Sequence, residues 1–363
     1  GPGGELPLPW LAQPLADMLT SQRGHALLVH GAAGVGALAF VLTLAQAWLC
    51  EGGSVGAGEA EAAGSARATR PCGRCASCRL VQNHLHPDLR VLLPETLRRA
   101  HRWPLAEDKP EGEDKRKPSR QIRIDEVRSL IDWSTRTSAR GRGKVGVMHP
   151  AEAMNATAAS ALLKTLEEPP AGTRLLLTCA DPALLLPTVV SRCQRLRLSE
   201  PADAAALAWL LQQGVDRPQV LLAACSGRPL DALELSGSGV DADAWSALPV
   251  AVAQGRVGVF SGWPVPRAID ALQKLCHDAL ARAVGGQGRF FGVRAAASAS
   301  VGQPSIDALL QWQRALQHVA RHAEHPWNEP LLLDALVQEA ATALSPPATS
   351  DVGSTDRMAT LRR

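Results

Sequence analysis

Tyrosine is absent from this chain of 363 residues, and phenylalanine occurs only 4 times. We attribute this to a bias in genomic composition, and it carries no functional information. The sequence also lacks any apolar run of about 18 residues, the length that a membrane-spanning helix requires. Its first residues lack the basic region and apolar stretch of a signal peptide. We therefore expect a cytoplasmic protein with no membrane partner.

An excess of either charge is missing too, because 38 basic residues nearly balance 35 acidic ones. The net charge of +3 is too small to predict nucleic-acid binding by itself. The chain is 46% hydrophobic and 20% charged, which suffices for a large core divided among two or three domains.

The stretch from Lys144 to Cys193 has the pattern of a βαβ unit. Two strand-like apolar runs, Lys144–Met148 and Arg174–Thr178, flank a helix predicted from Asn155 to Glu168. Two prolines follow Glu168 and end the helix, since proline cannot continue the backbone hydrogen bonds. An apolar segment then leads to Ser191-Arg192-Cys193.

A second strand and helix lie near the start of the chain and enclose a glycine-rich loop. His25–His30 is apolar, and the residues after Leu38 predict a helix to about Cys50. Strand, glycine loop and helix is the context of a P-loop, in which backbone N–H groups approach phosphate oxygens. The chemistry does not fit, because lysine and a hydroxyl residue should follow the last glycine. An ordinary glycine-rich turn therefore remains an alternative interpretation of this loop. Its residues are Gly31, Ala32, Ala33, Gly34, Val35, Gly36, Ala37 and Leu38.

Four cysteines are candidates for a metal site. Cys72, Cys75 and Cys78 have C-x₂-C-x₂-C spacing, and Cys50 lies upstream. Four thiolates can hold a tetrahedral zinc ion, which would leave no open position and so make the site structural. An iron–sulfur cluster and free thiols remain alternatives, and His84 or His86 could replace Cys50.

Outside this group, four cysteines lack any ligand spacing. We expect them to be buried small side chains. They are Cys179, Cys193, Cys225 and Cys276.

The segment Glu95–Arg120 is rich in proline and in charges of both signs. It has too little apolar surface to order itself, so we expect a solvent loop, with a nucleic-acid contact as the weaker alternative. A strand-like edge from Gln121 then leads into a helix through Trp133.

Asn155, the run Ala161–Pro170 and Ser191-Arg192-Cys193 together resemble the AAA+ clamp-loader subunits of bacterial DNA polymerase III. The resemblance covers nearly the whole chain and implies an α/β P-loop-type core with a small zinc-binding insertion, a helical lid and an all-α collar. It implies that all four cysteines of the candidate site hold structural zinc. The expected divisions are the core at 1–200, with the zinc module at about 50–86 and the charged loop at 95–120, then the lid at 201–240, the collar at 241–345 and a disordered tail at 346–363.

The resemblance also makes the glycine loop a decayed P-loop, with Gly31, Gly34, Gly36 and Ala37 as its remnant nucleotide-binding positions. Family members that hydrolyse ATP have Asp-Glu after the second core strand, where this chain has His149-Pro150. Glu152 lies nearby, and we interpret it as a solvated carboxylate at a helix entry in preference to a displaced catalytic base. Because the chain lacks the lysine, the hydroxyl and the carboxylates, we expect it neither to hydrolyse ATP nor to bind ATP as a functional cofactor.

In the predicted lid, Arg228 lies near the position of the family's sensor-2 arginine, but Pro229 follows it. A structural role at the start of a helix is therefore at least as well supported. Residues 236–240 have the composition of a glycine and serine linker.

By resemblance, this is a non-hydrolysing stator of the clamp loader, which places the sliding clamp on primed DNA. Gamma or tau and delta subunits would be its partners in a hetero-pentamer, and contact with the clamp and the primer-template would be indirect. Ser191-Arg192-Cys193 matches the family's arginine-finger motif, so Arg192 would act in trans on a neighbouring ATPase. The alternatives are an active gamma or tau-type motor, and a zinc-dependent nucleic-acid-binding module. Intact ATPase motifs would indicate the first, and a basic, aromatic-rich zinc region the second.

Overall fold

The computed structural model describes residues 8–21, 24–52, 71–104, 118–292, 304–322 and 327–346. The chain divides into two compact units, Gly1–Trp209 and Leu210–Arg363. Within the described ranges, no helix combines the length and the apolar character needed to cross a membrane. The expected disordered tail lies outside the described residues from position 347 onward.

The first unit is built on a parallel five-stranded sheet with the order β2-β3-β4-β1-β5. Strand β1 pairs with the central strand β4 on one side and with the edge strand β5 on the other, so Leu28 lies between Leu177 and Arg195. Both β1 and β3 are short apolar runs, as expected for parallel strands that are covered on both faces. The strands are β1 Ala26–His30, β2 Leu89–Leu92, β3 Lys144–Met148, β4 Thr173–Cys179 and β5 Gln194–Arg197.

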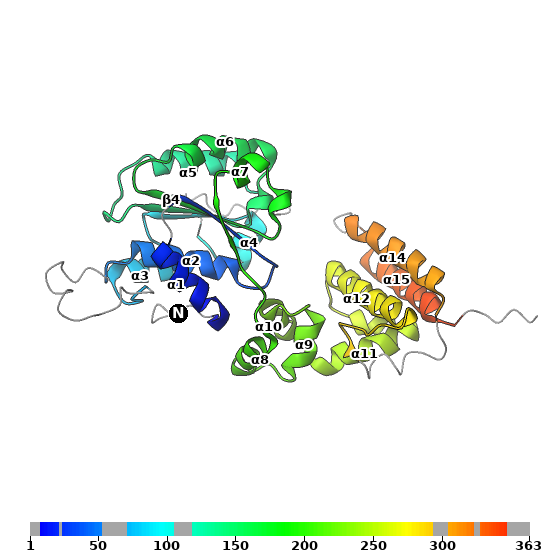
Figure 1. Cartoon of the computed structure of the whole chain (residues 1–363). Coiled ribbons are helices and arrows are strands. Elements are labelled where there is room, and N and C mark those ends of the chain that lie inside the picture. The colour runs from blue at the N-terminus through cyan, green and yellow to red at the C-terminus, as the bar shows by residue number, and fades with distance from the viewer. Residues whose placement is uncertain are drawn as a thin grey trace, which may run out of the picture. The chain divides into compact units, whose positions relative to one another are not determined.

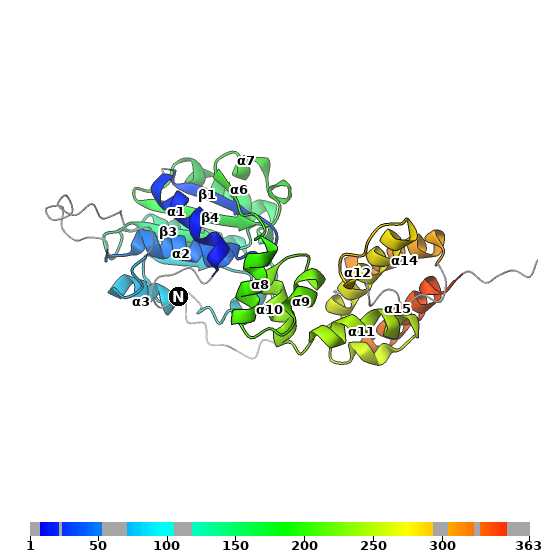
Figure 2. The ribbon, with the colours of Figure 1, turned by 60° about the horizontal axis from the view of Figure 1, so that its bottom comes forward.

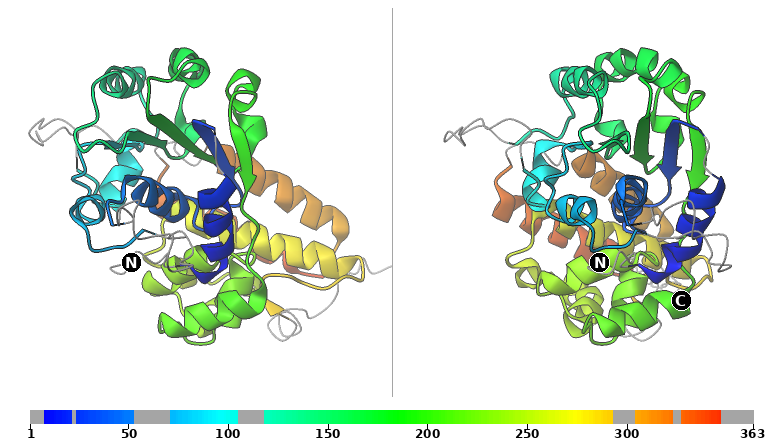
Figure 3. Two further views of the ribbon diagram at one scale, coloured as in Figure 1. Left: turned by 60° about the vertical axis from the view of Figure 1, so that its left-hand side comes forward. Right: turned by 90° about the vertical axis from the view of Figure 1, so that its left-hand side faces the viewer.

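Helices cover both faces of this sheet (Figures 1 and 2). Helices α5, α6 and α7 lie on one face and α1, α2 and α3 on the other, and Figure 3 shows the sheet between these layers. The helices of this unit are α1 Ala12–Ser21, α2 Ala37–Leu49, α3 Ala76–Gln82, α4 Glu95–Ala100, α5 Ile124–Ser134, α6 Ala156–Glu167 and α7 Pro187–Val190, with 3₁₀ turns η1 Pro9–Leu11, η2 Ala151–Ala153 and η3 Pro182–Leu184.

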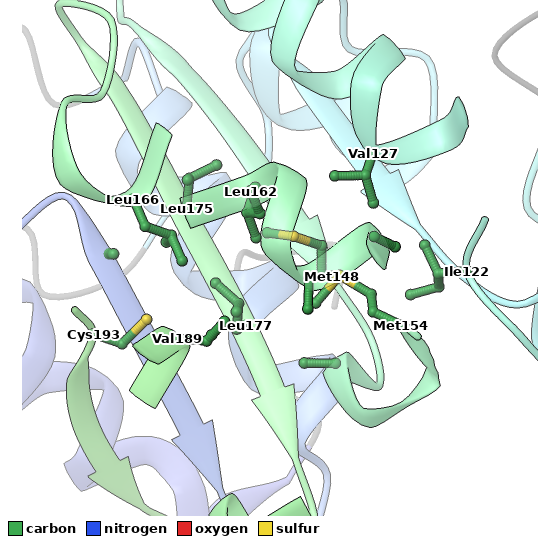
Figure 4. Packing of buried hydrophobic residues seen from close by; sticks show 14 of the residues in the cluster. Ile122, Val127, Met148, Met154, Leu162, Leu166, Leu175, Leu177, Val189 and Cys193 are labelled. Atoms are coloured by element: carbon green, nitrogen blue, oxygen red, sulfur yellow. The ribbon is translucent and has the colours of Figure 1, made fainter. Parts of the chain in front are cut away.

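One hydrophobic core lies between the sheet and the α5–α6 layer (Figure 4). Met148 of β3 and Leu177 of β4 are fully buried there, and Leu162 of α6 packs among them. Asn155 starts α6 because its side chain accepts the N–H of Ala158 at 2.9 Å. Full burial of a leucine contributes roughly 1.5–3 kcal/mol, so this core fixes α6 and, through it, the segments at its ends.

The predicted βαβ unit and α/β core are confirmed, but the loop predicted for Glu95–Arg120 is wrong at its start. Glu95–Ala100 form helix α4, in which Arg99 pairs with Glu95 at 2.6 Å across one turn. Arg98 also pairs with Glu126 of α5 at 3.4 Å. These ion pairs replace the apolar burial that the composition lacked. Residues 105–117 of the predicted loop lie outside the described residues.

The second unit is helical wherever it is described, as the sequence predicted. Long helices α12 and α14 pack together and against α15. The predicted linker at 236–240 is only partly correct, because α10 continues to Gly237 and Val240 is buried. From the helix that crosses the unit boundary onward, the elements are α8 Asp203–Gln212, α9 Pro218–Ala224, α10 Pro229–Gly237, α11 Ala242–Ala253, η4 Val257–Phe260, α12 Val265–Ala283, α14 Ile306–Arg321 and α15 Glu329–Leu344.

A buried carboxylate anchors the loop that follows α12. Asp278 is completely buried and accepts the backbone N–H groups of Arg289, Phe290 and Phe291 at 2.8, 2.9 and 3.0 Å. Trp245 of α11 donates its indole N–H to Phe290 at 3.0 Å. These bonds satisfy a buried charge that would otherwise be costly, so we assign Asp278 a structural role.

Candidate functional site

The glycine loop joins β1 to α2 in the geometry of a P-loop. Gly34 and Gly36 have positive φ angles of 77° and 103°, a region that glycine enters without steric cost. Helix α2 then begins at Ala37, without a side-chain cap. Two glycines with positive φ angles therefore turn the chain from β1 into α2, while Ala37 and Leu38 at the start of α2 offer neither ammonium nor hydroxyl.

The segment before α1 packs directly on this loop. Leu8 and Leu11 are almost fully buried, and a Cβ atom built on Gly36 would overlap Leu8 Cδ1. Trp10 donates its indole N–H to the carbonyl oxygen of Val35 at 2.9 Å. Sequence analysis missed this covering of the loop, because no local pattern shows which surface a short apolar segment covers.

After β3, His149 places a half-buried imidazole beside β4. The His149 Nδ1 atom lies 2.6 Å from Thr178 Oγ1 of β4 in a hydrogen bond. Burial lowers the pKa of His149 to about 4, so the ring is neutral near pH 7. A neutral imidazole cannot replace the carboxylate ligand of Mg²⁺.

Glu152 is not the solvated carboxylate that we expected. Its Oε1 atom accepts the N–H of Ala180 at 2.7 Å, and its Oε2 atom is buried without a hydrogen-bond partner in the described part of the chain. The bond ties η2 to the end of β4. The solvated interpretation is therefore wrong, because the end of β4 lies beside η2 in the folded chain.

A cavity of about 490 Å³ opens beside the first residues of the glycine loop, at the carboxyl ends of β1, β4 and β5. Asp181, Arg197 and Glu200 contribute charges of both signs to its lining. Burial and the nearby Arg197 and Arg195 lower the pKa of His30, which also lines the cavity. Two carboxylates and a neutral imidazole make this lining poorly suited to a triphosphate.

The four predicted cysteine ligands come together at the C-terminal end of α2. Their sulfur atoms all lie within 4.8 Å of one another. The Cys50–Cys75 and Cys72–Cys78 sulfur pairs are each 3.9 Å apart. A tetrahedral zinc site with bonds of about 2.3 Å requires sulfurs about 3.8 Å apart, so the sulfurs of Cys50, Cys72, Cys75 and Cys78 are close enough together to hold this metal.

Backbone N–H groups point at the sulfurs, as thiolate ligands require. The N–H groups of Cys72, Cys75 and Cys78 donate to the sulfurs of Cys50, Cys72 and Cys75, respectively, each at 3.4 Å. Burial raises the pKa of Cys72, but N–H donors from Arg74 and Cys75 outweigh it and bring the pKa to about 6. Burial raises the pKa values of Cys50 and Cys78. A cation would offset that cost, since a coordinating thiol gives up its proton.

A polar network connects the cysteine cluster to the sheet. Arg140 donates to Glu51 Oε1 at 2.7 Å and to Ser77 Oγ at 3.1 Å. Ser77 also bonds His86 Nε2 at 3.0 Å, and Asp88 accepts the N–H of Arg140 at 2.8 Å. His86 is therefore engaged in this network, and Cys50, not His86, lies with the other three cysteines. Sequence analysis missed the network because its members are up to 89 residues apart.

His84 also lies outside the sulfur cluster, because its ring stacks on Trp103 with a centroid separation of 3.8 Å. The four remaining cysteines are all buried, as expected for small packing residues. They are Cys179, Cys193, Cys225 and Cys276.

Arg192 lies just after α7 with its side chain 34% exposed. Its Nε atom donates to Glu167 Oε1 at 2.6 Å, and Nη1 donates to the carbonyl oxygen of Thr188 at 2.9 Å. Neighbouring Cys193 is buried in the core and anchors the motif. Arg192 therefore emerges at an edge of the core, as predicted. Its pairing with Glu167 was not predicted from the sequence.

Arg228 precedes α10 and donates to Asp231 Oδ2 at 2.6 Å. The two residues are three positions apart, so the pair closes the first turn of α10. This arrangement supports the structural role at a helix start.

Known proteins resemble this chain over more than half of its length. Residues 11–202 match the family described as DNA polymerase III, delta subunit. The chain is 38% identical over 224 residues to DNA polymerase III subunit delta' of Pseudomonas aeruginosa, covering 61% of this chain and 58% of that protein. It is 33% identical over 233 residues to subunit delta' of Haemophilus influenzae, covering 62% and 60%. The chain thus spans about six-tenths of the length of the curated relatives that it matches.

Among solved structures, it is similar to a DNA polymerase III gamma subunit-related protein of Thermotoga maritima, with a TM-score of 0.46, 15% identity and coverage of 92% and 99%. The family match extends over more than half of the chain, from η1 to the start of α8, and so includes the glycine loop, the cysteine cluster and the Arg192 edge. The two curated relatives described above are delta' subunits, and the chain belongs to the DNA polymerase III delta-subunit family.

Proposed function

We propose that this chain is a non-hydrolysing subunit of a DNA polymerase III clamp loader. It helps to load the sliding clamp onto primed DNA, and it contributes Arg192 to the ATP site of an adjacent motor subunit. One observation carries the proposal: the glycine loop keeps its backbone path but has Ala37 and Leu38 where phosphate chemistry needs lysine and a hydroxyl.

Three further features support the loss of nucleotide chemistry. Leu8 occupies the space beside Gly36, and Trp10 is bonded to the loop. His149 stands where a Mg²⁺-binding carboxylate is needed, and its imidazole is engaged with Thr178. Mg²⁺ and the terminal phosphates would therefore find no charged partner from these positions.

The cysteine cluster has a structural part in this proposal. Cys50, Cys72, Cys75 and Cys78 would hold one zinc ion, which supplies four metal–sulfur cross-links that join the end of α2 to α3. The Glu51–Arg140–Ser77 contacts then hold this module against the sheet. With all four positions filled by protein, the ion is not a catalyst.

Partners follow from the family. Gamma or tau and delta subunits would assemble with this chain into a hetero-pentamer, in which the second unit acts as lid and collar. Arg192 is permanently charged, and its planar guanidinium suits phosphate oxygens. It would stabilise the charge that develops on the γ-phosphate of the adjacent site.

The experiment is ATP hydrolysis and clamp loading by a reconstituted complex that carries Arg192→Ala. Removing an arginine finger has lowered single-site rates by roughly 10³–10⁵-fold in other NTPases. Because other motor sites remain, we expect a partial loss of bulk hydrolysis and a larger loss of clamp loading.

Two variants serve as comparisons. Arg192→Lys keeps the charge but loses the forked geometry, so it should recover little. Arg195→Ala removes an exposed arginine from β5 and should match the wild-type complex. A wild-type level of both activities in an assembled Arg192→Ala complex would disprove the trans-acting role.

A further inference from the structure

Two segments that are well separated in the sequence meet in one surface ion pair. Glu167 ends α6, and Arg192 follows α7. Arg192 Nε donates to Glu167 Oε1 at 2.6 Å, and Nη2 forms an ion pair with the same oxygen. Arg192 Nη1 donates to the Thr188 carbonyl oxygen at 2.9 Å and to Ser191 Oγ at 3.3 Å. All three guanidinium nitrogens are therefore engaged by the same chain.

The elements that carry this pair are held in place by the core. Leu166, next to Glu167, is 1% exposed, and Val189 of α7 is also 1% exposed. Helices α6 and α7 pack against one another. The carboxylate is therefore presented to Arg192 by fixed backbone, which distinguishes it from a chance contact between two free surface side chains.

The pair itself is weak enough to open. The side chains of Arg192 and Glu167 are 34% and 48% exposed, and ion pairs at such surfaces are easily screened. A triphosphate carries more negative charge and accepts stronger, charge-assisted hydrogen bonds from guanidinium. A γ-phosphate brought close to Arg192 can thus replace Glu167 as its partner.

We propose that Glu167 is a positioning residue that holds Arg192 against its own chain until a neighbouring subunit presents ATP. This inference rests on the proposed trans-acting role of Arg192. In this arrangement Glu167 and the γ-phosphate compete for one guanidinium. The carboxylate lowers futile hydrolysis by the complex before clamp and DNA have aligned the subunits.

The test uses Glu167→Gln in the reconstituted complex. Glutamine keeps the size of the side chain but removes its charge, so Arg192 is released. We expect basal ATP hydrolysis, without clamp or DNA, to rise about two- to five-fold, as loss of a surface ion pair allows. The rate stimulated by clamp and DNA should stay unchanged, so the ratio of stimulated to basal rates should fall.

Glu168→Gln is the matched control. Glu168 is the adjacent carboxylate, exposed at the end of the same helix, and no ion pair joins it to another described residue. Its variant should show the basal rate of the wild type. An equal rise in both variants would mean that general surface charge, and not the Arg192 partner, sets the basal rate, and would overturn the proposal.

A double-variant cycle separates this inference from the proposed function. If Arg192→Ala lowers the stimulated rate, Glu167→Gln alone raises the basal rate, and Glu167→Gln has no effect in the Arg192→Ala background, both ideas stand. If Arg192→Ala lowers the rate but Glu167→Gln alone changes nothing, only the positioning role is wrong. If Arg192→Ala has no effect, the trans-acting role fails, and the positioning role fails with it.

The isolated chain gives a second measurement that does not depend on hydrolysis. Phenylglyoxal modifies accessible guanidinium groups, and mass spectrometry can follow the reaction at Arg192. We expect Arg192 to react at least twice as fast in Glu167→Gln as in the wild type or Glu168→Gln. Equal reaction rates in all three proteins would show that Glu167 does not hold the guanidinium, and the inference would be rejected.

Discussion

The two ends of helix α2 differ in whether the side chains of a binding site are present. At its N-terminus, Gly34 and Gly36 preserve the path of a P-loop, but Ala37 and Leu38 provide none of its polar side chains. At its C-terminus, Cys50 follows the helix and lies 3.9 Å, sulfur to sulfur, from Cys75. The N-terminal end has the glycine backbone but no polar side chains for phosphate. The C-terminal end has all four cysteines of the candidate metal site.

On the proposed function, loop shape and loop chemistry can be separated. The path of the glycine loop depends on positive φ angles, which glycine alone provides at little cost. Phosphate transfer depends on a few charged side chains, and their removal leaves the path intact. Apolar packing by Leu8 then adds stability at a site that no longer needs room for nucleotide.

The largest effect should come from removing one of the four cysteines that cluster at the C-terminal end of α2. Replacing Cys75 with serine removes one of four thiolates, so zinc content should fall from one ion per chain to nearly none. Loss of a structural metal is among the few changes that destabilise a domain by about 4 kcal/mol or more. Elemental analysis and urea unfolding measure the two quantities.

Cys225→Ser is the control for that experiment, since Cys225 is buried in the second unit and remote in sequence from the cluster. It should keep its zinc. Iron in place of zinc, or a wild-type protein that is fully folded without metal, would contradict the structural zinc site.

A smaller effect is expected at the glycine-loop end. Leu8→Ala removes a buried side chain from beside Gly36 and should lower the free energy of unfolding by about 3 kcal/mol. Leu184→Ala, at a position that is 68% exposed, should change it by less than about 0.5 kcal/mol. If the two variants were equally stable in urea, Leu8 would not be sealing the loop.

The His149 imidazole should make stability depend on pH. Burial lowers the folded-state pKa of His149 to about 4, against an ordinary value of 6.5. Between these values the unfolded chain binds a proton that the folded chain does not, so stability falls as the pH falls through this window. From pH 7 to pH 5, His149 should account for a loss of about 2 kcal/mol.

His149→Gln isolates this contribution from that of other histidines. Its free energy of unfolding should fall less than that of the wild type between pH 7 and pH 5. Parallel pH profiles for the two proteins would mean that the imidazole is already solvated in the folded state.

The smallest change is expected from restoring the lost P-loop side chains. The double variant Ala37→Lys, Leu38→Thr recreates the ammonium and the hydroxyl, but Leu8 and His149 remain. We therefore expect no detectable gain in Mg-ATP binding by equilibrium dialysis. Micromolar affinity in this variant would show that two side chains alone separate the chain from a nucleotide-binding protein.

Features defined by local pattern could be predicted from the sequence. The βαβ unit followed from two apolar strands around a capped helix, and the cysteine pattern with Cys50 upstream identified the four residues that cluster in the fold. Helix α4 was missed because its order depends on Arg98 reaching Glu126 on another helix. The sealing of the loop by Leu8 and the pairing of Glu167 with Arg192 also depend on which segments meet in space.

The most direct test of the central claim, that this subunit has no nucleotide chemistry of its own, is a calorimetric titration of the isolated zinc-loaded chain with Mg-ATP. The same samples are assayed for released phosphate. We predict no saturable heat up to millimolar ATP and no turnover, because neither the glycine loop nor the end of β3 offers a charged partner. Submicromolar binding accompanied by turnover would contradict the account.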